Sequence, residues 1–369
     1  MRDTIVEARA SGQRPRASQL APPSPTRMRT GSPSLSVCVP TFNGSRFLGP
    51  CLTSILGQTF TDFELILVDD VSSDETLDIA QDFARRDSRI RIERNDKNRG
   101  LVGNWRRSVE LASAPFVKFV FQDDVIAPTC IETLMSAADS GHLLIFCGRD
   151  FVFAPSVSPE SRDAYEKNRR IIAEVYGKGG AISARRFCDA TLDNMTMNLV
   201  GEPTVALLHR SVFDDFGWFN GDMLSLCDAE FWARIGVNRG VYHVNETLAT
   251  FRVHASAASA IHNARYEYRA RVIDRLLFRH EAAFSPVYAP LRDVASQRSP
   301  PIDLVEDFWE SVHWARWEAT HGRPSVSSPL DEWREVTRMY SRLGSIPLKY
   351  RMRRISRSIA RRAHRSPGA

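Results

Sequence analysis

No stretch of the 369-residue sequence approaches the roughly 20 consecutive apolar residues that a membrane-spanning helix requires. The first 34 residues also contain no apolar core of the length found in a secretory signal, and they are rich in Arg, Ser and Pro. We therefore expect residues 1–33 to form a disordered leader. A transit peptide fits less well, because Asp3 and Glu7 are acidic.

The six cysteines include no C-x-x-C pair. Neither a zinc site nor a disulfide framework is therefore indicated, and a reducing cytoplasm fits best. Two phosphate-binding motifs are missing as well: there is no G-x-G-x-x-G after the first expected strand and no G-x-x-x-x-G-K-[ST] anywhere. Dinucleotide-binding and P-loop proteins are disfavoured, and any phosphate charge must be met by other groups.

The composition is ordinary for a globular protein, with 43% hydrophobic and 25% charged residues, and the length suits one large domain or two smaller ones. The net charge of +5 is concentrated in Lys349 to Arg365, which contains no acidic residue. Met352, Ile355 and Ile359 recur there at helical spacing, as in a basic helix on an anionic membrane surface; a solvated basic end is the alternative. Nucleic acid ranks last, because no aromatic residues interleave with the arginines.

Apolar runs and helical periodicities alternate along the first 124 residues. Strands are expected at 35–42, 63–70, 89–95 and 116–124, with helices at 47–58, from the Ser72/Glu75 capping box to about 86, and after residue 100. This order predicts βαβ units, hence an α/β fold with a mostly parallel central sheet flanked by helices. From Tyr266 onward the pattern is helical, which predicts a C-terminal helical extension.

Two of the expected strands end in paired acids, Asp69-Asp70 and Asp123-Asp124. Ligands of open parallel sheets bind at the carboxyl ends of the strands, where both pairs fall. The nearby Asp74 can equally be a helix cap. Asp123 and Asp124 come too early to cap the next helix, and two hard oxygen ligands suit Mg²⁺ or Mn²⁺ bridging to phosphate.

The segment VCVPTFNGSRFLGPCLTSILGQTFTDFELILVDDVSSDET, followed by NRGLVGNWRRSVELASAPFVKFVFQDDV, resembles the opening of family 2 glycosyltransferases, which have the GT-A fold. The resemblance extends over about Leu35 to Ser259. It implies a metal-dependent enzyme that moves a sugar from a nucleotide-sugar donor, most commonly UDP-linked, to a hydroxyl acceptor with inversion. Divisions are therefore expected at 34–262 (GT-A domain), 263–346 (helical region) and 347–369 (basic tail).

The resemblance also assigns roles around the donor. Asp70 matches the acid that contacts the base, with Asp69 as its support, and Gln122-Asp123-Asp124 occupies the place of the D-x-D motif. Asp124 is then the expected metal ligand and Asp123 a contact to ribose or sugar. The remaining matches to nucleotide-binding positions are Pro40, Thr41, Asn43, Asn98, Gly100 and Asn104.

On the acceptor side, LCDAEFWARIGVNRG resembles the segment that carries the catalytic acid. Asp228 matches the general base, with Glu230 as its substitute because Cys227 replaces a common Glu, and Arg234 is expected to pair with nearby carboxylates. In FRVHASAAS, His254 is the expected second metal ligand and Arg252 a diphosphate contact.

The implied partners are a nucleotide-sugar donor, a glycan or lipid-linked acceptor and, through the basic tail, an anionic membrane. A place in surface polysaccharide assembly, on the cytoplasmic face of the membrane, would suit them. Two alternatives stay open: a sugar-phosphate nucleotidyltransferase, and a degenerate nucleotide-sugar-binding scaffold favoured by Gln122 and Cys227.

Overall fold

The structure is a computed structural model that describes residues 32–257, 260–261, 265, 267–322 and 326–352. Its centre is a nine-stranded sheet of order β3-β2-β1-β4-β8-β6-β9-β5, in which β7 also pairs with β9. The strands are β1 Leu35–Thr41, β2 Phe63–Asp69, β3 Ile90–Arg94, β4 Phe116–Phe119, β5 Val125–Ile126, β6 Leu144–Phe153, β7 Gly180–Ile182, β8 Ala206–His209 and β9 Val241–Val253.

The expected α/β fold with a largely parallel sheet is confirmed. Strands β3, β2, β1 and β4 run parallel, as do β6 and β9, while the short strands β5, β7 and β8 are antiparallel to their neighbours. All seven residues of β1 are buried, as expected for a strand covered on both faces. Because β1 and β2 are parallel neighbours, their carboxyl ends lie side by side at one edge of the sheet.

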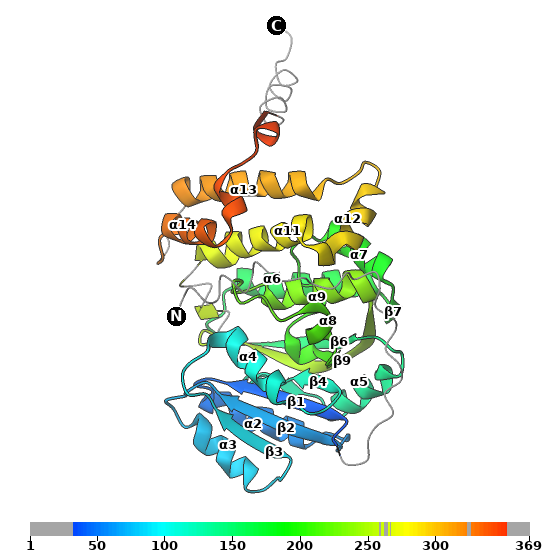
Figure 1. Ribbon diagram of the computed structural model, residues 1–369. Coiled ribbons are helices and arrows are strands. Elements are labelled where there is room, and N and C mark those ends of the chain that lie inside the picture. The colour runs from blue at the N-terminus through cyan, green and yellow to red at the C-terminus, as the bar shows by residue number, and fades with distance from the viewer. Residues whose placement is uncertain (1–31, 258–259, 262–264, 266, 323–325, 353–369) are drawn as a thin grey trace.

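Helices cover both faces of the sheet and continue into a C-terminal layer (Figure 1). Those around the sheet are α2 Ser45–Leu56, α3 Thr76–Ala84, α4 Gly100–Leu111, α5 Cys130–Ala138, α6 Pro159–Tyr176, α7 Ala184–Asp193, α8 Val212–Phe216 and α9 Cys227–Arg239. Those of the C-terminal layer are a π-turn at Arg269–Ile273, α11 Asp274–Phe284, α12 Ala289–Ser296, α13 Leu304–His321 and α14 Pro329–Met339.

The expected C-terminal helical extension is thus present, and its buried side chains belong to the same apolar core as the sheet. Within the described ranges, no helix has the length and apolar character needed to cross a bilayer. All six cysteines are buried and free.

One local prediction is wrong. The Ser72/Glu75 capping box does not form. Helix α3 begins at Thr76, and the side chain of its N-cap residue, Glu75, makes no capping hydrogen bond. Ser72 instead accepts a hydrogen bond from the N–H of Asn43, 2.9 Å away. The hydroxyl is used to join two loops at the edge of the sheet, so tertiary contacts override the local motif.

Candidate functional site

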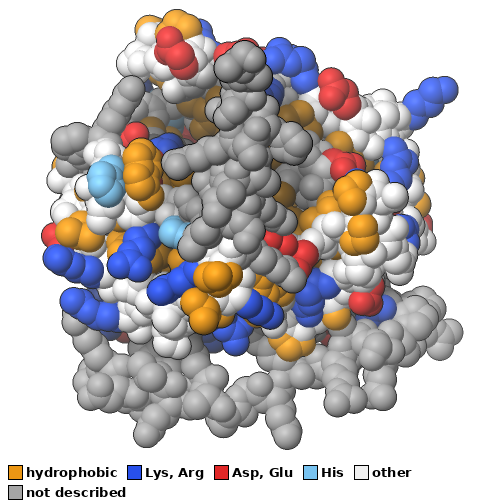
Figure 2. Space-filling model, turned by 90° about the horizontal axis from the view of Figure 1, so that it is seen from above, with side chains coloured by type: hydrophobic (Ala, Val, Ile, Leu, Met, Phe, Trp, Pro, Cys, Tyr) orange, Lys and Arg blue, Asp and Glu red, His pale blue; other side chains and the backbone are white. Residues whose placement is uncertain are grey.

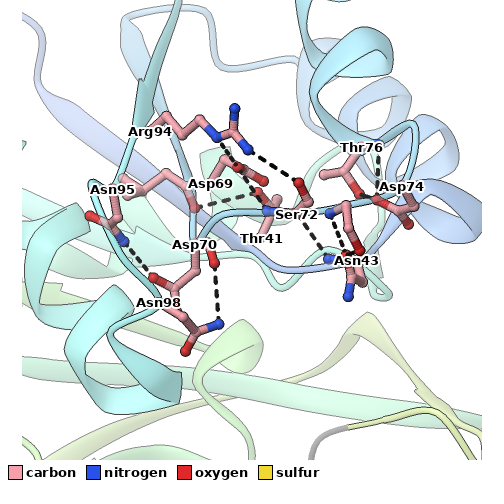
Figure 3. A network of polar contacts seen from close by, with 12 residues as sticks. Thr41, Asn43, Asp69, Asp70, Ser72, Asp74, Thr76, Arg94, Asn95 and Asn98 are labelled. Atoms are coloured by element: carbon pink, nitrogen blue, oxygen red, sulfur yellow. Dashed lines mark hydrogen bonds and ion pairs between the residues drawn. The ribbon is translucent and has the colours of Figure 1, made fainter.

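The carboxylate of Asp70, directly after β2, is buried and anchors the loop that leads into α4. It accepts hydrogen bonds from Asn95 Nδ2 (2.7 Å) and from the N–H groups of Arg99 (2.8 Å) and Gly100 (3.0 Å). Asn98 donates to the carbonyl oxygen of Asp70 at 3.2 Å. Figure 3 shows this network at the carboxyl ends of the strands. Asp70, Asn98 and Gly100, all expected at the nucleotide, are therefore brought together.

The neighbouring Asp69 is fully buried and faces the other way. Its Oδ2 accepts from the N–H of Ser72 at 3.1 Å and lies 3.3 Å from Arg94 Nε (Figure 3). Its Oδ1 makes no hydrogen bond within the described part of the chain. Asp69 thus supports the loop after β2, as expected of it.

Asn104 and Asn43 tie the strand ends to one another. Asn104 Nδ2 donates to the carbonyl oxygens of Val68 (3.0 Å) and Thr41 (3.3 Å). Asn43 has a positive φ of 47° and accepts from the N–H of Ser73 at 2.9 Å. Both asparagines were predicted to lie at the nucleotide. Their hydrogen bonds fix the conformation of the loops that follow β1, near Pro40, and β2.

Gln122, at the first position of the acidic motif, forms two hydrogen bonds with the backbone of Phe42. Its Oε1 accepts from the Phe42 N–H at 2.9 Å, and its Nε2 donates to the Phe42 carbonyl at 3.1 Å. A Cβ at Gly44 would lie 2.1 Å from this Oε1, so the glycine leaves room for the amide. An uncharged residue here joins the loop after β1 to the loop after β4.

Asp123 and His254 face each other across the loops after β4 and β9. Asp123 Oδ2 lies 3.1 Å from His254 Nε2, and the two side chains are 17% and 8% exposed. His254 Nδ1 lies 2.8 Å from Ser256 Oγ, which orients the ring. Arg252 Nε donates to the Asp123 carbonyl at 3.0 Å, and its guanidinium lies over the Phe47 ring at 4.9 Å.

Asp124 is the residue expected to bind the metal. It is fully buried; its Oδ2 accepts from Thr204 Oγ1 at 2.5 Å and its Oδ1 from the Arg252 N–H at 3.1 Å. Burial, and then the charge of Asp123, raise the pKa of Asp124 well above its usual value. Lys118, also fully buried, donates to the Thr204 carbonyl at 2.6 Å. Asp124 is thus bound to protein donors below the surface of the site.

Asp228 lies in the first turn of α9, where the helix dipole favours a negative charge. Its Oδ2 accepts from Asn198 Nδ2 at 3.0 Å and its Oδ1 from the Ala229 N–H at 2.7 Å. Burial, and then the charge of Glu202, raise the pKa of Asp228 to about 7. A carboxylate with such a pKa is suited to accept a proton near neutral pH.

Glu202 is a functional candidate that the sequence reasoning missed. It forms an ion pair with the buried Arg149, and its charge raises the pKa of both Asp124 and Asp228. Arg149 Nη2 also donates to Asn168 Oδ1 of α6 at 2.8 Å, and Asn168 donates to the Asn198 carbonyl at 2.9 Å. The only signal for Glu202 in the sequence was its place between Gly201 and Pro203, which does not reveal the partner on β6.

Glu230, considered as a substitute base, is buried in a structural contact. Its Oε2 lies 2.8 Å from Arg234 Nη2, and Tyr288 O–H donates to its Oε1 at 3.1 Å. Arg234 also donates to the carbonyls of Phe216 and Trp218. The expected pairing of Arg234 with a carboxylate is confirmed, and Glu230 is occupied by it.

The donor set around Asp123 fits a hard divalent cation that also binds phosphate. No cluster of three or more His, Cys, Asp or Glu side chains suited to a metal occurs among the residues described. Mg²⁺ usually keeps several waters and is held by one or two carboxylates together with substrate phosphates, so a complete protein cage is not required. The facing pair Asp123 and His254 supplies one oxygen and one nitrogen for such an ion.

Comparison with known proteins identifies relatives of this chain. The glycosyl transferase family 2 profile matches residues 36–199. An uncharacterized protein of Mycobacterium tuberculosis is 30% identical over 225 residues, 60% of this chain and 67% of that protein. A GalNAc(5)-diNAcBac-PP-undecaprenol beta-1,3-glucosyltransferase of Campylobacter jejuni is 38% identical over 115 residues, 31% of this chain but only 37% of that enzyme.

Solved structures share the fold at low sequence identity. TarS of S. aureus in complex with UDP-GlcNAc aligns with a TM-score of 0.53 and 16% identity, covering 77% of this chain and 83% of that one. A mannosyltransferase of Pyrobaculum calidifontis in complex with GDP-Man and Mn²⁺ aligns with a TM-score of 0.50 and 15% identity, covering 88% and 83%.

Proposed function

Because the chain belongs to glycosyl transferase family 2, we propose that it moves a sugar from a nucleotide-sugar donor to a hydroxyl acceptor and inverts the anomeric carbon. The observation that carries this proposal is Asp228, a buried carboxylate with a pKa of about 7 at the start of α9. The charge of Glu202 raises the pKa of both Asp228 and Asp124, which supports one site shared by the proposed base and the Asp123–Asp124 loop.

The donor would bind at the edge formed by the ends of β1, β2 and β4. Its nucleoside would meet the loop around Asp70, Asn98 and Gly100, whose backbone is fixed by the hydrogen bonds described above. Arg252 would lie near the diphosphate, because its guanidinium is held beside Asp123 and Phe47.

Asp123 and His254 would hold Mn²⁺ or Mg²⁺, which supplies positive charge to the leaving diphosphate. This assignment replaces Asp124 as the metal ligand, because Asp124 is fully buried, with Thr204 and Arg252 as its donors, whereas the Asp123 side chain is 17% exposed. We assign Asp124 the role of holding Thr204 and Arg252 in place, and Arg252 in turn contacts the Asp123 carbonyl.

The transfer step uses Asp228 as general base. The acceptor oxygen attacks the anomeric carbon from the face opposite the diphosphate, its proton passes to the Asp228 carboxylate, and the bond from carbon to the phosphate oxygen breaks. A single displacement of this kind inverts the anomeric configuration. Asn198 and the Ala229 N–H hold the two carboxylate oxygens and so orient the base before the acceptor arrives.

We further propose a UDP-linked donor and a glycan or lipid-linked acceptor, as in surface polysaccharide assembly. TarS binds UDP-GlcNAc, and the Campylobacter relative is named for an undecaprenol-linked substrate. These names support the class of substrate and do not identify the sugar.

Contact with an anionic membrane at its cytoplasmic face would bring the enzyme to lipid-linked acceptors. The proposed contact is the basic tail, most of which lies outside the described residues. At its start, Leu348 and Met352 are 71% and 54% exposed. Figure 2, which looks onto this end of the molecule, shows Lys and Arg side chains spread among hydrophobic ones. Deleting residues 349–369 should abolish binding to vesicles containing anionic lipid; unchanged binding would overturn this part.

The function itself is tested by a thermal-shift panel of UDP, GDP, dTDP and CDP, each with and without Mn²⁺ or Mg²⁺. A ligand present at 100 times its Kd stabilises the folded protein by about 2.7 kcal/mol. Metal-dependent stabilisation by one nucleotide, followed by release of that nucleotide from its sugar conjugate, is the expected result. A folded protein that responds to no nucleotide would contradict the proposal.

A further inference from the structure

The segment just before α9 is held by one buried carboxylate from the C-terminal helices. Asp274, the first residue of α11, is fully buried. Its oxygens accept hydrogen bonds from three successive backbone N–H groups: Leu224 at 3.1 and 3.0 Å, Ser225 at 2.6 Å and Leu226 at 3.2 Å. Hydrogen bonds to a charged acceptor are stronger than neutral ones, so this contact fixes the segment firmly.

The segment held in this way leads directly to the proposed base. Leu226 precedes α9, and its carbonyl accepts the N–H of Glu230 at 2.9 Å, which closes the first helical turn. Asp228 lies inside that turn, two residues after Leu226. A shift of the Leu224–Leu226 backbone would therefore move the Asp228 carboxylate.

Two further contacts from the same helical layer hold Asp222, two residues before Leu224. Tyr340 O–H donates to Asp222 Oδ2 at 2.8 Å, and Arg269 Nη2 donates to the Asp222 carbonyl at 3.2 Å. Figure 1 shows α11 lying between α9 and α13. The C-terminal helices thus contact the 222–226 segment at several points, and Asp274 binds the part of the segment that is nearest to Asp228 in the sequence.

Asp274 is costly for the fold itself. Burial raises the pKa of Asp274 to about 6, and the three N–H groups oppose that shift. A buried acid that only filled space could be replaced by an apolar side chain without loss. The Asp274 oxygens instead accept hydrogen bonds from three consecutive backbone N–H groups, which an apolar side chain could not do, so the carboxylate fixes the backbone conformation of this segment.

Resting on the proposed function, we infer that Asp274 is a positioning residue for the transfer reaction: it sets the backbone of 224–226 and thereby aims Asp228 at the acceptor hydroxyl. The C-terminal helical layer is then part of the catalytic apparatus, although it contributes no group that touches the substrate. Misplacement of a catalytic group by about 1 Å can lower the rate by about 10²-fold.

The test compares Asp274→Ala, Asp274→Asn and Tyr340→Phe with the wild type and with Glu332→Gln. Glu332 is a buried acid of α14 in the same layer whose Oε1 accepts a hydrogen bond from Ser327 rather than from 222–226, so its variant reports general destabilisation of the layer. The activity readout is nucleotide release from UDP-glucose, UDP-N-acetylglucosamine or GDP-mannose, whichever the wild type consumes. UDP binding with Mn²⁺, and amide hydrogen exchange at 224–226, are measured in parallel.

Asp274→Ala is expected to lower kcat about ten- to a hundredfold, to leave nucleotide binding unchanged, and to speed exchange at 224–226 by about tenfold or more. Asp274→Asn keeps one acceptor oxygen and should recover part of both effects. Tyr340→Phe should show a smaller fall in kcat, and Glu332→Gln none.

Faster exchange at 224–226 with an unchanged kcat would overturn the inference while leaving the proposed function intact. Unchanged exchange would show that the contact does not hold the segment, and would also overturn it. If the wild type released nucleotide from none of the donors and bound none, the proposed function would fail and the role of Asp274 with it, whatever the exchange rates.

Discussion

Asp123 Oδ2 and His254 Nε2 lie 3.1 Å apart although 131 residues separate them in the chain. Asp124, the neighbour of Asp123, points the other way and is fully buried. Two adjacent acids therefore have different surroundings: Asp123 is partly exposed beside an imidazole, and Asp124 is enclosed by hydrogen-bond donors. This contrast allows their roles to be separated by experiment.

Asp123→Asn should abolish the metal-dependent part of nucleotide binding, because it removes the charged ligand next to His254. We expect the thermal shift given by UDP with Mn²⁺ to fall to the value given by UDP alone, with little change in the Tm of the unliganded protein. His254→Ala should act in the same direction. If Asp123→Asn kept the full Mn²⁺-dependent thermal shift, Asp123 would not be the metal ligand.

Asp124→Ala should act on stability first. It leaves the Thr204 hydroxyl and the Arg252 N–H without their acceptor, and a buried polar group that loses its partner costs about 1–3 kcal/mol. Urea denaturation should show this decrease in the free energy of unfolding. Stability equal to that of the wild type would mean that water replaces the carboxylate.

Asp228→Asn should reduce kcat by roughly 10²–10⁴-fold, the contribution typical of a general base. Asparagine can still accept from Asn198 or from the Ala229 N–H, so the local structure and UDP binding should be preserved. The comparison is between turnover and the UDP thermal shift of the same preparation. Near-normal turnover would exclude Asp228 as the base.

The pH dependence of turnover follows from the pKa of Asp228, which burial and then Glu202 raise to about 7. Below that pH the carboxyl group is protonated and cannot accept the proton of the acceptor, so kcat should rise with pH up to about 7 and then level off. Glu202→Gln removes one cause of the raised pKa, and the rise should move to lower pH. A rise at the same pH in this variant would contradict the assignment.

The raised pKa of Asp228 also makes stability depend on pH, and in the opposite direction to kcat: the free energy of unfolding falls as the pH rises. Between pH 3.8, the ordinary pKa of an aspartate, and about pH 7, the raised pKa of Asp228, the folded protein holds a proton on Asp228 that the unfolded chain has released. The contribution of Asp228 to stability is therefore fully present below 3.8 and is lost as the pH rises toward 7. Asp228→Asn should flatten this part of the stability profile.

Gly44→Ala should disturb the junction between the loops after β1 and β4. The added Cβ would lie 2.1 Å from Gln122 Oε1 and would displace the amide from the backbone of Phe42. We expect a lower Tm and a weaker response to UDP. Gly49→Ala in α2, the helix that follows Gly44, is the matched control, because nothing lies within 4 Å of its added Cβ, and it should be neutral. Equal behaviour of the two variants would show that Gln122 is not needed.

The fold was predictable because the strands β1 and β2 are continuous apolar runs and the helices between strands have clear periodicity. The residues around Asp70 were predictable for a similar reason, since they follow strand ends directly. The surroundings of Asp124, the expected metal ligand, could not be predicted, because they depend on Thr204, 80 residues away, and on the path of β9. Glu202 and Asp274 were missed because their partners come from distant elements that no local pattern specifies.

The position of β8 has a consequence for how the chain acquires its structure during synthesis. β8, at 206–209, lies between β4 and β6 and pairs with both, so the strand that joins the two parts of the sheet leaves the ribosome after β4 and β6. Pairings between segments far apart in sequence slow folding, and unpaired strand edges expose nascent chains to aggregation. We expect nascent chains released before residue 206 to need chaperones, and native compaction to begin only once β8 has emerged.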